Sequence, residues 1–474
     1  MEPAPQSQCT ATSRTFAHLR PVLSAAAPLA AGLLLRLWML KQFFEVTGDA
    51  LIYGGLAKNM LLHGSYALTQ ASGEMDATLI RLPGYPLFLA LCFKVLGMEN
   101  YASAACVQIL LELLGCLLLA AFVRRIAPTG LARGAGLATL WLAALCPFTA
   151  IYAAEPLTES LTLFALALAL WAVARFHGRP AWSAALLFTF AVSFAALLRP
   201  DGALVGVALA PAMLPAFKGS RSFSRVLRMA LICTLLALAP FAVWTARNWH
   251  VFHVFEPLAP RYANDPGEDP HLGWESWIKT WCLDFVSTYD VYWNVPDGEL
   301  DLSKLPSRAF DSPAQYAETA ALAADYNATH VLTHELDERF RKLAEERVKA
   351  HPVRSLVLLP MGRLADMVLR PRVENLPIDL DWWVYAHHRA ETRLSWAYAG
   401  LNALYLLLAL AGLCLRPRFW PWMVAYILLR SALLLTVEAP EARYTLEFFP
   451  ILFALGGIGI CGGWRVLRKG LENQ

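Results

Sequence analysis

The chain has 474 residues, of which 57% are apolar and only 16% are Asp, Glu, Lys or Arg. Soluble globular domains carry about 25% charged residues and roughly 45–50% apolar residues with glycine counted. The composition therefore excludes a disordered chain and an ordinary soluble enzyme, and it indicates a protein that crosses a membrane several times.

The net charge of +3 is unevenly distributed along the chain. Residues 247–393 hold 23 acidic and 16 basic residues, whereas the rest of the chain is basic and apolar. We therefore predict three regions. They are an N-terminal transmembrane module at 1–246 with an external loop at 43–101, an external acidic block at 247–395, and a C-terminal transmembrane module at 396–474.

Ten apolar runs approach the roughly 20 residues that a helix needs to cross a bilayer. They lie at 22–42, 102–123, 133–153, 157–176, 182–198, 202–217, 227–246, 396–415, 419–437 and 446–464. The first run lacks a small-residue cleavage site, so we interpret it as a signal anchor. The run at 84–97 is too short to span and predicts an interfacial helix. The predicted fold class is an all-α polytopic membrane protein.

Basic clusters in the loops set the predicted orientation. With ten spans and a cytoplasmic N-terminus, every cluster between spans lies on the cytoplasmic side. The clusters are Arg124-Arg125 with Arg133, Arg175 with Arg179, Lys218 with Arg221, Arg225 and Arg228, Arg416 with Arg418, and Arg465 with Arg468-Lys469. The external loop, the acidic block and the loop at 438–447 then share the outer face.

The acidic block is predicted to be mostly helical. Residues 317–349 contain few helix breakers and predict a helical pair or one long helix. Residues 353–370 alternate apolar runs with Arg354, Arg363 and Arg370, which is typical of an amphipathic helix on a membrane surface.

Three carboxylates lie at predicted outer membrane boundaries. Asp49 follows the first span and is a candidate catalytic base, although an Asp there also serves as a helix N-cap. Glu159 falls just inside a span, where an ionisable residue is costly and usually faces a cavity or a partner; the alternative is a helix-start residue favoured by the dipole. Glu155 is a weaker candidate because it is predicted to be more exposed.

Arginines and polar partners gather at the same face. Arg199 and Asp201 flank a Pro-Gly turn and are candidates for substrate binding or for a pair with each other. Arg81 precedes the interfacial helix. Arg443, next to Tyr444, offers a bidentate fork suited to phosphate, or else snorkels to the interface.

Other polar residues favour structural roles. Glu112 and Arg430 are the deepest charges in the predicted spans and are expected to pair with each other. His330 and His334 have helical spacing for a metal, but they more simply occupy a solvated helix face, and the zinc-protease arrangement is absent. The sequence has no Walker A, GxGxxG or GxSxG motif, and we expect no nucleic-acid partner.

The sequence resembles the GT-C superfamily of lipid-linked-sugar glycosyltransferases. It is most similar to the bacterial branch related to protein O-mannosyltransferases and lipid A aminoarabinose transferases. The matching segments are GDALIYGGLAKNMLLHGSY (48–66), RLPGYPLFLALCFKVLG (81–97), EPLTESLTLF (155–164), LLRPDGALV (197–205), TARNWHVFHVFEPLA (245–259), 345–356 with His351-Pro352, and ARYTLEFFPIL (442–452).

The resemblance implies a polyprenyl-phosphate sugar donor and transfer on the external face. Asp49 matches the family's catalytic base, and Glu159 matches its second acidic residue. Arg443-Tyr444 matches the family's Arg-Tyr pair, so that Arg443 would neutralise the donor phosphate, with Arg81 as a further candidate. Protein mannosyltransferases have adjacent Asp-Glu where this chain has Asp49-Ala50, which weakens the case for a protein acceptor.

The sequence therefore predicts an inverting glycosyltransferase in a bacterial inner membrane, with a glycan, lipid or protein as acceptor. Some family members bind a divalent cation, but this sequence shows no clear ligand set for one. The alternative is a non-enzymatic transporter or flippase of lipid-linked glycans, which should carry ionisable residues near the bilayer midplane. A structural scaffold would leave the clustered carboxylates unexplained.

Overall fold

The computed structural model describes residues 11–217, 223–296 and 298–472, and the predicted loop residues Lys218 and Arg221 lie outside this part of the chain. The first half contains α1 (Ala11–Phe43), α2 (Asp49–His63), β1 (Ala67–Thr69), β2 (Met75–Ala77), α3 (Gly84–Leu96), α4 (Tyr101–Ile126), α5 (Ala132–Ala144), α6 (Pro147–Ala154), α7 (Glu159–Gly178), α8 (Trp182–Leu198), α9 (Leu204–Leu209) between two 3-10 segments, and α10 (Phe223–Phe252). The second half contains α11 (Leu272–Lys279), α12 (Phe285–Ser287), α13 (Pro313–Asn327), α14 (His334–Ala350), α15 (Leu359–Leu369), α16 (Arg389–Cys414), α17 (Trp420–Leu434) and α18 (Phe449–Glu472).

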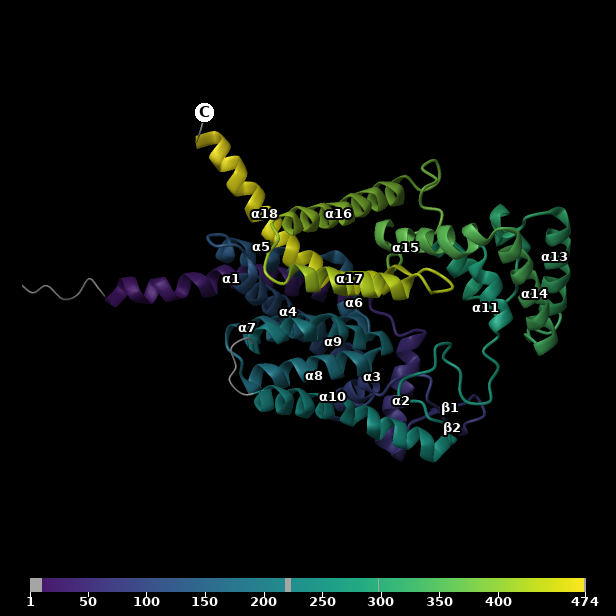
Figure 1. Ribbon diagram of the computed structural model, residues 1–474. Coiled ribbons are helices and arrows are strands. Elements are labelled where there is room, and N and C mark those ends of the chain that lie inside the picture. The colour runs from purple at the N-terminus through teal and green to yellow at the C-terminus, as the bar shows by residue number, and fades with distance from the viewer. Residues whose placement is uncertain (1–10, 218–222, 297, 473–474) are drawn as a thin grey trace, which may run out of the picture.

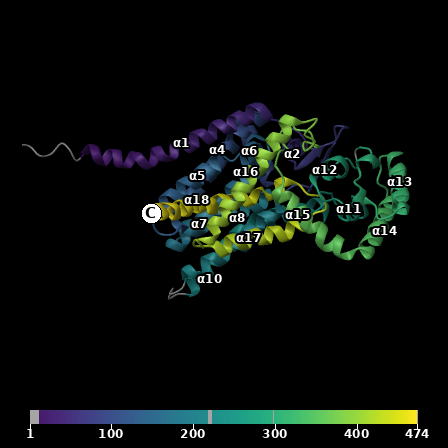
Figure 2. The ribbon, with the colours of Figure 1, turned by 90° about the horizontal axis from the view of Figure 1, so that it is seen from above.

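The long apolar helices form one bundle. The acidic block at 247–395, or polar block, covers one end of this bundle. Figure 1 shows α4, α7, α8, α10, α16 and α17 running in broadly the same direction. The helices α11, α13 and α14 lie beyond one end of the bundle in both views, while the start of α1 and the C-terminus lie toward the other end (Figures 1 and 2). This arrangement agrees with the predicted all-α polytopic fold.

All ten predicted spans coincide with helical segments. Among the described residues, six helices are long and apolar enough to cross a membrane, and α5 with α6 makes a seventh if that bent pair is one span. Three further predicted spans correspond to the shorter apolar helices at 182–198, 200–216 and 420–434. The interfacial helix predicted at 84–97 is α3, which is also shorter than a span.

The break between α5 and α6 has a local cause. The two helices meet at an angle of 51°, and Pro147 occupies the first turn of α6. A proline has no backbone N–H and disfavours helical backbone in the residue before it, so it starts a new helix and does not continue the old one. This break positions the loop that carries Glu155.

Glycines allow close backbone contact between α16 and α18. A Cβ atom on Gly412 of α16 would lie 1.9 Å from the carbonyl oxygen of Leu455 in α18. A Cβ atom on Gly459 would lie 2.3 Å from the carbonyl oxygen of Leu408. Small residues at helix interfaces let membrane helices pack backbone to backbone, so these two glycines fix the α16–α18 contact.

The polar block has a separate aromatic core. Its largest buried side chains include Trp277, Trp281 and Phe340, which bring α11 and α14 together. Residues 317–349 form the predicted helical pair, α13 and α14, and Thr333 caps α14 by accepting a hydrogen bond from the backbone N–H of Leu336. The flanking helices α10 and α16 extend into the block, to Phe252 and from Arg389 respectively.

The amphipathic segment predicted at 353–370 is helical throughout most of its length. A π-helical turn at Arg354–Leu358 continues into α15. Its apolar side chains Val353, Leu356 and Leu358 are more than half exposed, whereas Arg363 is buried and donates to the carbonyl oxygens of the block. The segment thus has one exposed apolar face and one face that packs on the rest of the block, as expected of a helix that lies on a membrane surface.

Candidate functional site

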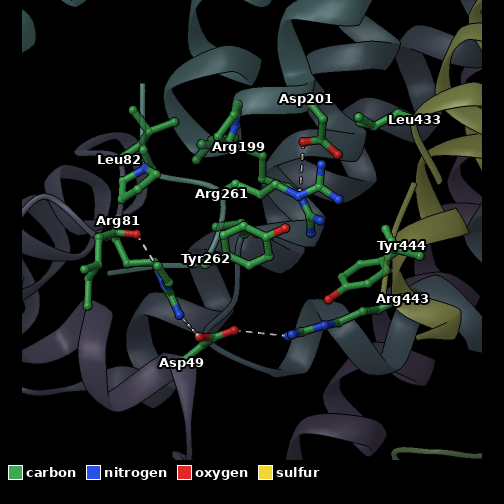
Figure 3. Close-up of a pocket in the computed structure, with 18 of the residues that line it drawn as sticks. Asp49, Arg81, Leu82, Arg199, Asp201, Arg261, Tyr262, Leu433, Arg443 and Tyr444 are labelled. Carbon is green, nitrogen blue, oxygen red and sulfur yellow. Dashed lines mark hydrogen bonds and ion pairs between the residues drawn. The ribbon is translucent and has the colours of Figure 1, made fainter. Parts of the chain in front are cut away.

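A cavity of about 770 Å³ lies where the bundle meets the polar block. Its wall combines α2, the ends of α7 and α8, the loop at 259–263 and the segment after α17. Seven of the eight predicted site residues line it, namely Asp49, Arg81, Glu159, Arg199, Asp201, Arg443 and Tyr444. The fold thus brings Asp49 into contact with Arg443, which is 394 positions away in the sequence (Figure 3).

Asp49 is held between two arginines. Its carboxylate accepts a hydrogen bond of 2.7 Å from Arg81 Nη2 on one oxygen and one of 3.2 Å from Arg443 Nη1 on the other. Figure 3 shows the carboxylate between the two guanidinium groups. Gly48 precedes α2 with φ of 50°, and the helix has no side-chain cap. The alternative prediction that Asp49 is only a helix cap is therefore wrong.

The two arginines determine the ionisation of Asp49. Burial alone would raise the pKa of this carboxyl group, but the charges of Arg443 and Arg81 outweigh burial and hold the pKa below its ordinary value. Asp49 is therefore ionised at neutral pH, and it is an acceptor of hydrogen bonds and not a donor.

Arg443 lies at the junction of the site and is not a snorkelling residue. Besides Asp49, its guanidinium pairs with Glu441 at 2.5 Å. The neighbouring Tyr444 donates its hydroxyl hydrogen to Glu441 at 2.5 Å, and its ring lies beneath Arg199 and Arg443, each 5.7 Å from the ring centre. Glu441 and Tyr444 thus fix the direction of the Arg443 side chain.

Glu159 belongs to a second charged group in the wall. It is nearly fully buried and accepts a hydrogen bond of 3.1 Å from Arg199. Arg199 also pairs with Asp201 at 3.4 Å and with Glu447 at 3.7 Å. The predicted Arg199–Asp201 pair is therefore confirmed, but as one part of a larger network that includes Glu159.

The prediction that Glu112 pairs with Arg430 is wrong. Arg430 donates to Asp201 and Glu447, each at 2.7 Å, and so completes the network of the cavity wall. Glu112 pairs with the fully buried Arg36 of α1. The sequence indicated how deep each charged residue lies in the bilayer, but not toward which neighbouring helix its side chain points.

Glu155 lines a second cavity, of about 420 Å³. Asn375 donates to its carboxylate at 2.5 Å. Burial, reinforced by the charge of Glu159, raises the pKa of Glu155 to about 7, although the Asn375 amide opposes the shift. Asp49, Leu157 and Arg443 line both cavities, so the Asp49–Arg443 pair is part of the wall between them.

The predicted histidine pair is not on one helix face, because His330 follows α13 and His334 begins α14. Within the described residues, three possible metal ligands converge only at Asp379, Asp381 and His388. None of these three lines either cavity. No metal site at the candidate active site follows from these side chains.

Several residues of the site were not singled out from the sequence. Arg261 and Lys279 both pair with Glu438 at the rim of the first cavity, at 2.8 and 2.6 Å. Glu374 and Asn375 reach the second cavity from the loop after α15. Lys279 ends the short helix α11 and the other three residues lie in loops. Their spacing carries no signal that links them to Asp49.

Comparisons with known proteins give one family match and several similar solved structures. No functionally curated protein sequence matches the chain. Among solved structures, the archaeal oligosaccharyltransferase AglB from Archaeoglobus fulgidus, in complex with an inhibitory peptide and a dolichol-phosphate, is 11% identical with a TM-score of 0.44. That similarity covers 95% of this chain and 51% of the archaeal chain, so this chain spans about half its length.

ArnT from Cupriavidus metallidurans is similar in two structures. The apo form is 15% identical with a TM-score of 0.39, over 94% of this chain and 78% of that chain. The form bound to undecaprenyl phosphate is 16% identical with a TM-score of 0.39, over 93% and 77%.

The family match is local and covers part of the site. Residues 81–245 match the model of the dolichyl-phosphate-mannose-protein mannosyltransferases. The matched segment contains Arg81, Glu155, Glu159, Arg199 and Asp201. Over this segment the chain is similar to the protein mannosyltransferases, as the resemblance of the sequence predicts.

Proposed function

We propose that the chain is an inverting glycosyltransferase that moves a sugar from a polyprenyl-phosphate donor to a hydroxyl acceptor at the external membrane face. The observation that carries this proposal is the position of Asp49. Its ionised carboxylate lies in the wall shared by two cavities and contacts two arginines, Arg81 and Arg443. The proposed base is therefore in direct contact with the two arginines that are proposed to bind the donor phosphate.

The first cavity suits the donor. Its lining joins arginines to the apolar side chains of Leu82, Leu204, Leu433 and Leu434. A polyprenyl phosphate needs both an apolar path for the chain and fixed positive charge for the phosphate. The match to a family that uses dolichyl-phosphate-mannose supports the same donor class.

The proposed reaction is a single displacement. The acceptor oxygen attacks the anomeric carbon while Asp49 takes the hydroxyl proton, and the bond from that carbon to the phosphate oxygen breaks. The electron pair leaves with the polyprenyl phosphate, whose negative charge Arg443 and Arg81 neutralise. Attack opposite the leaving group inverts the anomeric centre. Glu159 holds Arg199 at the cavity wall, and Tyr444 holds Arg443.

The two arginines link donor binding to the base. In the structure they pair with Asp49 and keep it ionised. A donor phosphate would draw both guanidinium groups toward itself, which would weaken their hold on the carboxylate and make it a stronger base. Asp49 would then gain basicity when the donor is in place.

The transporter alternative receives less support from the buried charges. Arg36 pairs with Glu112, and Arg430 pairs with Asp201 and Glu447. Charges fixed in mutual pairs inside a bundle serve packing, whereas a transporter needs ionisable groups that face the transported substrate.

A transfer assay tests the proposed function. Purified protein in detergent is supplied with a panel of radiolabelled polyprenyl-phosphate sugars and with membrane-extracted acceptors, and the anomeric configuration of the product is determined by NMR. We expect one donor to be consumed with inversion. Retention of configuration would exclude the single displacement. Absence of turnover together with movement of lipid-linked glycan across proteoliposomes would establish the transporter instead.

A further inference from the structure

The second cavity differs in chemistry from the first. It lies on the other side of the Asp49–Arg443 pair and has two distinct walls. One wall is aromatic, and the other carries carboxylates. The residues of these walls are Phe285, Tyr289 and Trp293, and Tyr152, Glu155, Glu374, Asn375 and Glu441.

The aromatic wall comes from one short helical segment of the polar block, residues 285–293. Phe285, Tyr289 and Trp293 are spaced four residues apart along α12 and the π-helical turn that follows it. Their ring centres are 5.5 to 6.2 Å apart. Tyr289 is 53% exposed and Trp293 is 44% exposed. Two large ring faces therefore remain open to a molecule in the cavity.

Four carboxylates line this cavity, and Arg443 is the one basic residue among the described residues that line it. Asp49 and Glu441 pair with Arg443, but the other two carboxylates have neutral partners. Asn375 donates to Glu155, and Tyr152 donates to Glu374 at 3.4 Å. In the described part of the chain, the remaining oxygen of Glu374, Oε2, is buried without a hydrogen-bond partner.

This geometry favours an organic cation over a metal ion. Within the described residues, no group of three carboxylate, His or Cys ligands in this cavity converges closely enough to hold one ion. The volume of about 420 Å³ is within the range of small-molecule sites. Aromatic faces beside unbalanced carboxylates are the surroundings that bind ammonium groups, through cation–π contact and charge.

We propose that the second cavity is the acceptor subsite and that it selects a hydroxyl compound bearing an ammonium group, such as an amino sugar. The ammonium group lies between Glu155, Glu374 and the ring of Trp293. The same molecule presents a hydroxyl group to Asp49 at the wall between the cavities. The role as acceptor subsite rests on the proposed function, whereas the preference for a cation does not.

A binding experiment without donor tests the preference. The full chain in nanodiscs at pH 7.5 is titrated with 2-aminoethyl glucoside, which is positively charged, and with 2-hydroxyethyl glucoside, which is neutral and otherwise matched. Affinity is measured by isothermal titration calorimetry. We expect the amine to bind at least tenfold more tightly than the neutral glycoside.

Variants locate the preference in this cavity. The Glu155→Gln, Glu374→Gln double variant should lower the preference to under threefold and leave affinity for the neutral glycoside unchanged, which also shows that it is folded. Trp293→Leu should weaken binding of the amine more than that of the neutral glycoside. Glu318→Gln, an exposed change of the same kind on α13, should retain the full preference.

The possible failures are distinguishable. Equal affinities of the two glycosides for the wild type, or a preference that survives the double substitution, would overturn the inference. Sugar transfer to the amine and to the neutral acceptor at equal rates, unchanged in the double variant, would overturn it while the proposed function stands. Selective amine binding in a protein without transferase activity would keep the cation site and reject the proposed function.

Discussion

The Asp49 carboxylate and the Arg443 guanidinium form an ion pair of 3.2 Å although 394 residues separate them in the sequence. Asp49 begins the first helix after α1, and Arg443 precedes α18. Their contact therefore requires the N-terminal and C-terminal parts of the chain to pack against each other. Because both residues line both cavities, this pair is the point at which the proposed donor and acceptor meet.

Replacement of Arg443 should weaken donor binding more than it lowers the stability of the fold. Arg443→Lys keeps the charge but loses the planar fork that matches a phosphate, and we expect about a tenfold rise in the KM for the donor. Arg443→Gln should lower kcat/KM by roughly 10–100-fold, which corresponds to about 1.4–2.8 kcal/mol, the range of a charged hydrogen bond. Steady-state kinetics with the identified donor measures both changes.

Arg341→Gln is the matched control for this series, since Arg341 is exposed on α14 and pairs only with helix neighbours among the described residues. It should leave the KM unchanged. If Arg443→Gln also leaves the KM unchanged, Arg443 does not bind the donor phosphate.

Glu275, in the wall of the first cavity, should make stability depend on pH. Burial, reinforced by the charge of Glu438, raises the pKa of Glu275 to about 7. The folded state therefore keeps a proton that the unfolded state releases, so this contribution to stability is fully present below the ordinary pKa of 4.5 and is lost as the pH rises through 7. Glu275→Gln should raise the Tm at pH 8 by roughly 2–4 °C, the shift that about 1 kcal/mol gives a region of this size.

The same substitution should have almost no effect at pH 4, where Glu275 is mostly protonated in both the folded and the unfolded state. Thermal unfolding followed by intrinsic fluorescence at the two pH values measures the difference. Glu318→Gln, at an exposed position, should change neither Tm. An equal shift at both pH values for Glu275→Gln would show that packing and not ionisation is responsible.

The Arg36–Glu112 pair should be required for folding but not for catalysis. Both side chains are buried in the bundle, and Arg36 also donates to the carbonyl oxygen of Ala144 at 2.6 Å. Arg36→Leu leaves a buried carboxylate without its partner, which costs about 3–5 kcal/mol. We expect a sharp loss of monodisperse protein in size-exclusion chromatography.

The double variant Arg36→Leu, Glu112→Leu removes both charges and should recover most of the monodisperse fraction, with the transfer rate near that of the wild type. A double variant that folds but no longer transfers sugar would assign this pair a functional role and would favour the transporter alternative.

The sequence predicted the fold well because membrane helices have a strong one-dimensional signal. Ten apolar runs became ten helical segments, and the shorter run at 84–97 became α3. The break at Pro147 within one predicted span was missed, since its residues on both sides are equally apolar. The orientation in the membrane and the division into three regions remain predictions.

The site was only partly accessible from the sequence. Family motifs pointed to Asp49, Arg443 and the other residues of the first cavity, and the structure brings these together. The pairing of Glu112 was predicted wrongly because hydropathy shows how deep a residue lies in the bilayer. It does not show which neighbouring helix the side chain faces. The aromatic wall of the second cavity was not predicted, because Phe285, Tyr289 and Trp293 lie in a short helical stretch with no distinctive pattern.

The Asp49→Asn variant gives the most direct test of the central claim, because it keeps the shape of the side chain and removes the base. With the identified donor and acceptor, we predict a loss of at least 100-fold in transfer rate, while the Tm and the binding of polyprenyl phosphate are retained. Asp76→Asn, the same kind of change at an exposed position of β2 outside both cavities, does not alter the base and serves as the control. Transfer by folded Asp49→Asn at the wild-type rate would contradict the assignment of Asp49 as the catalytic base.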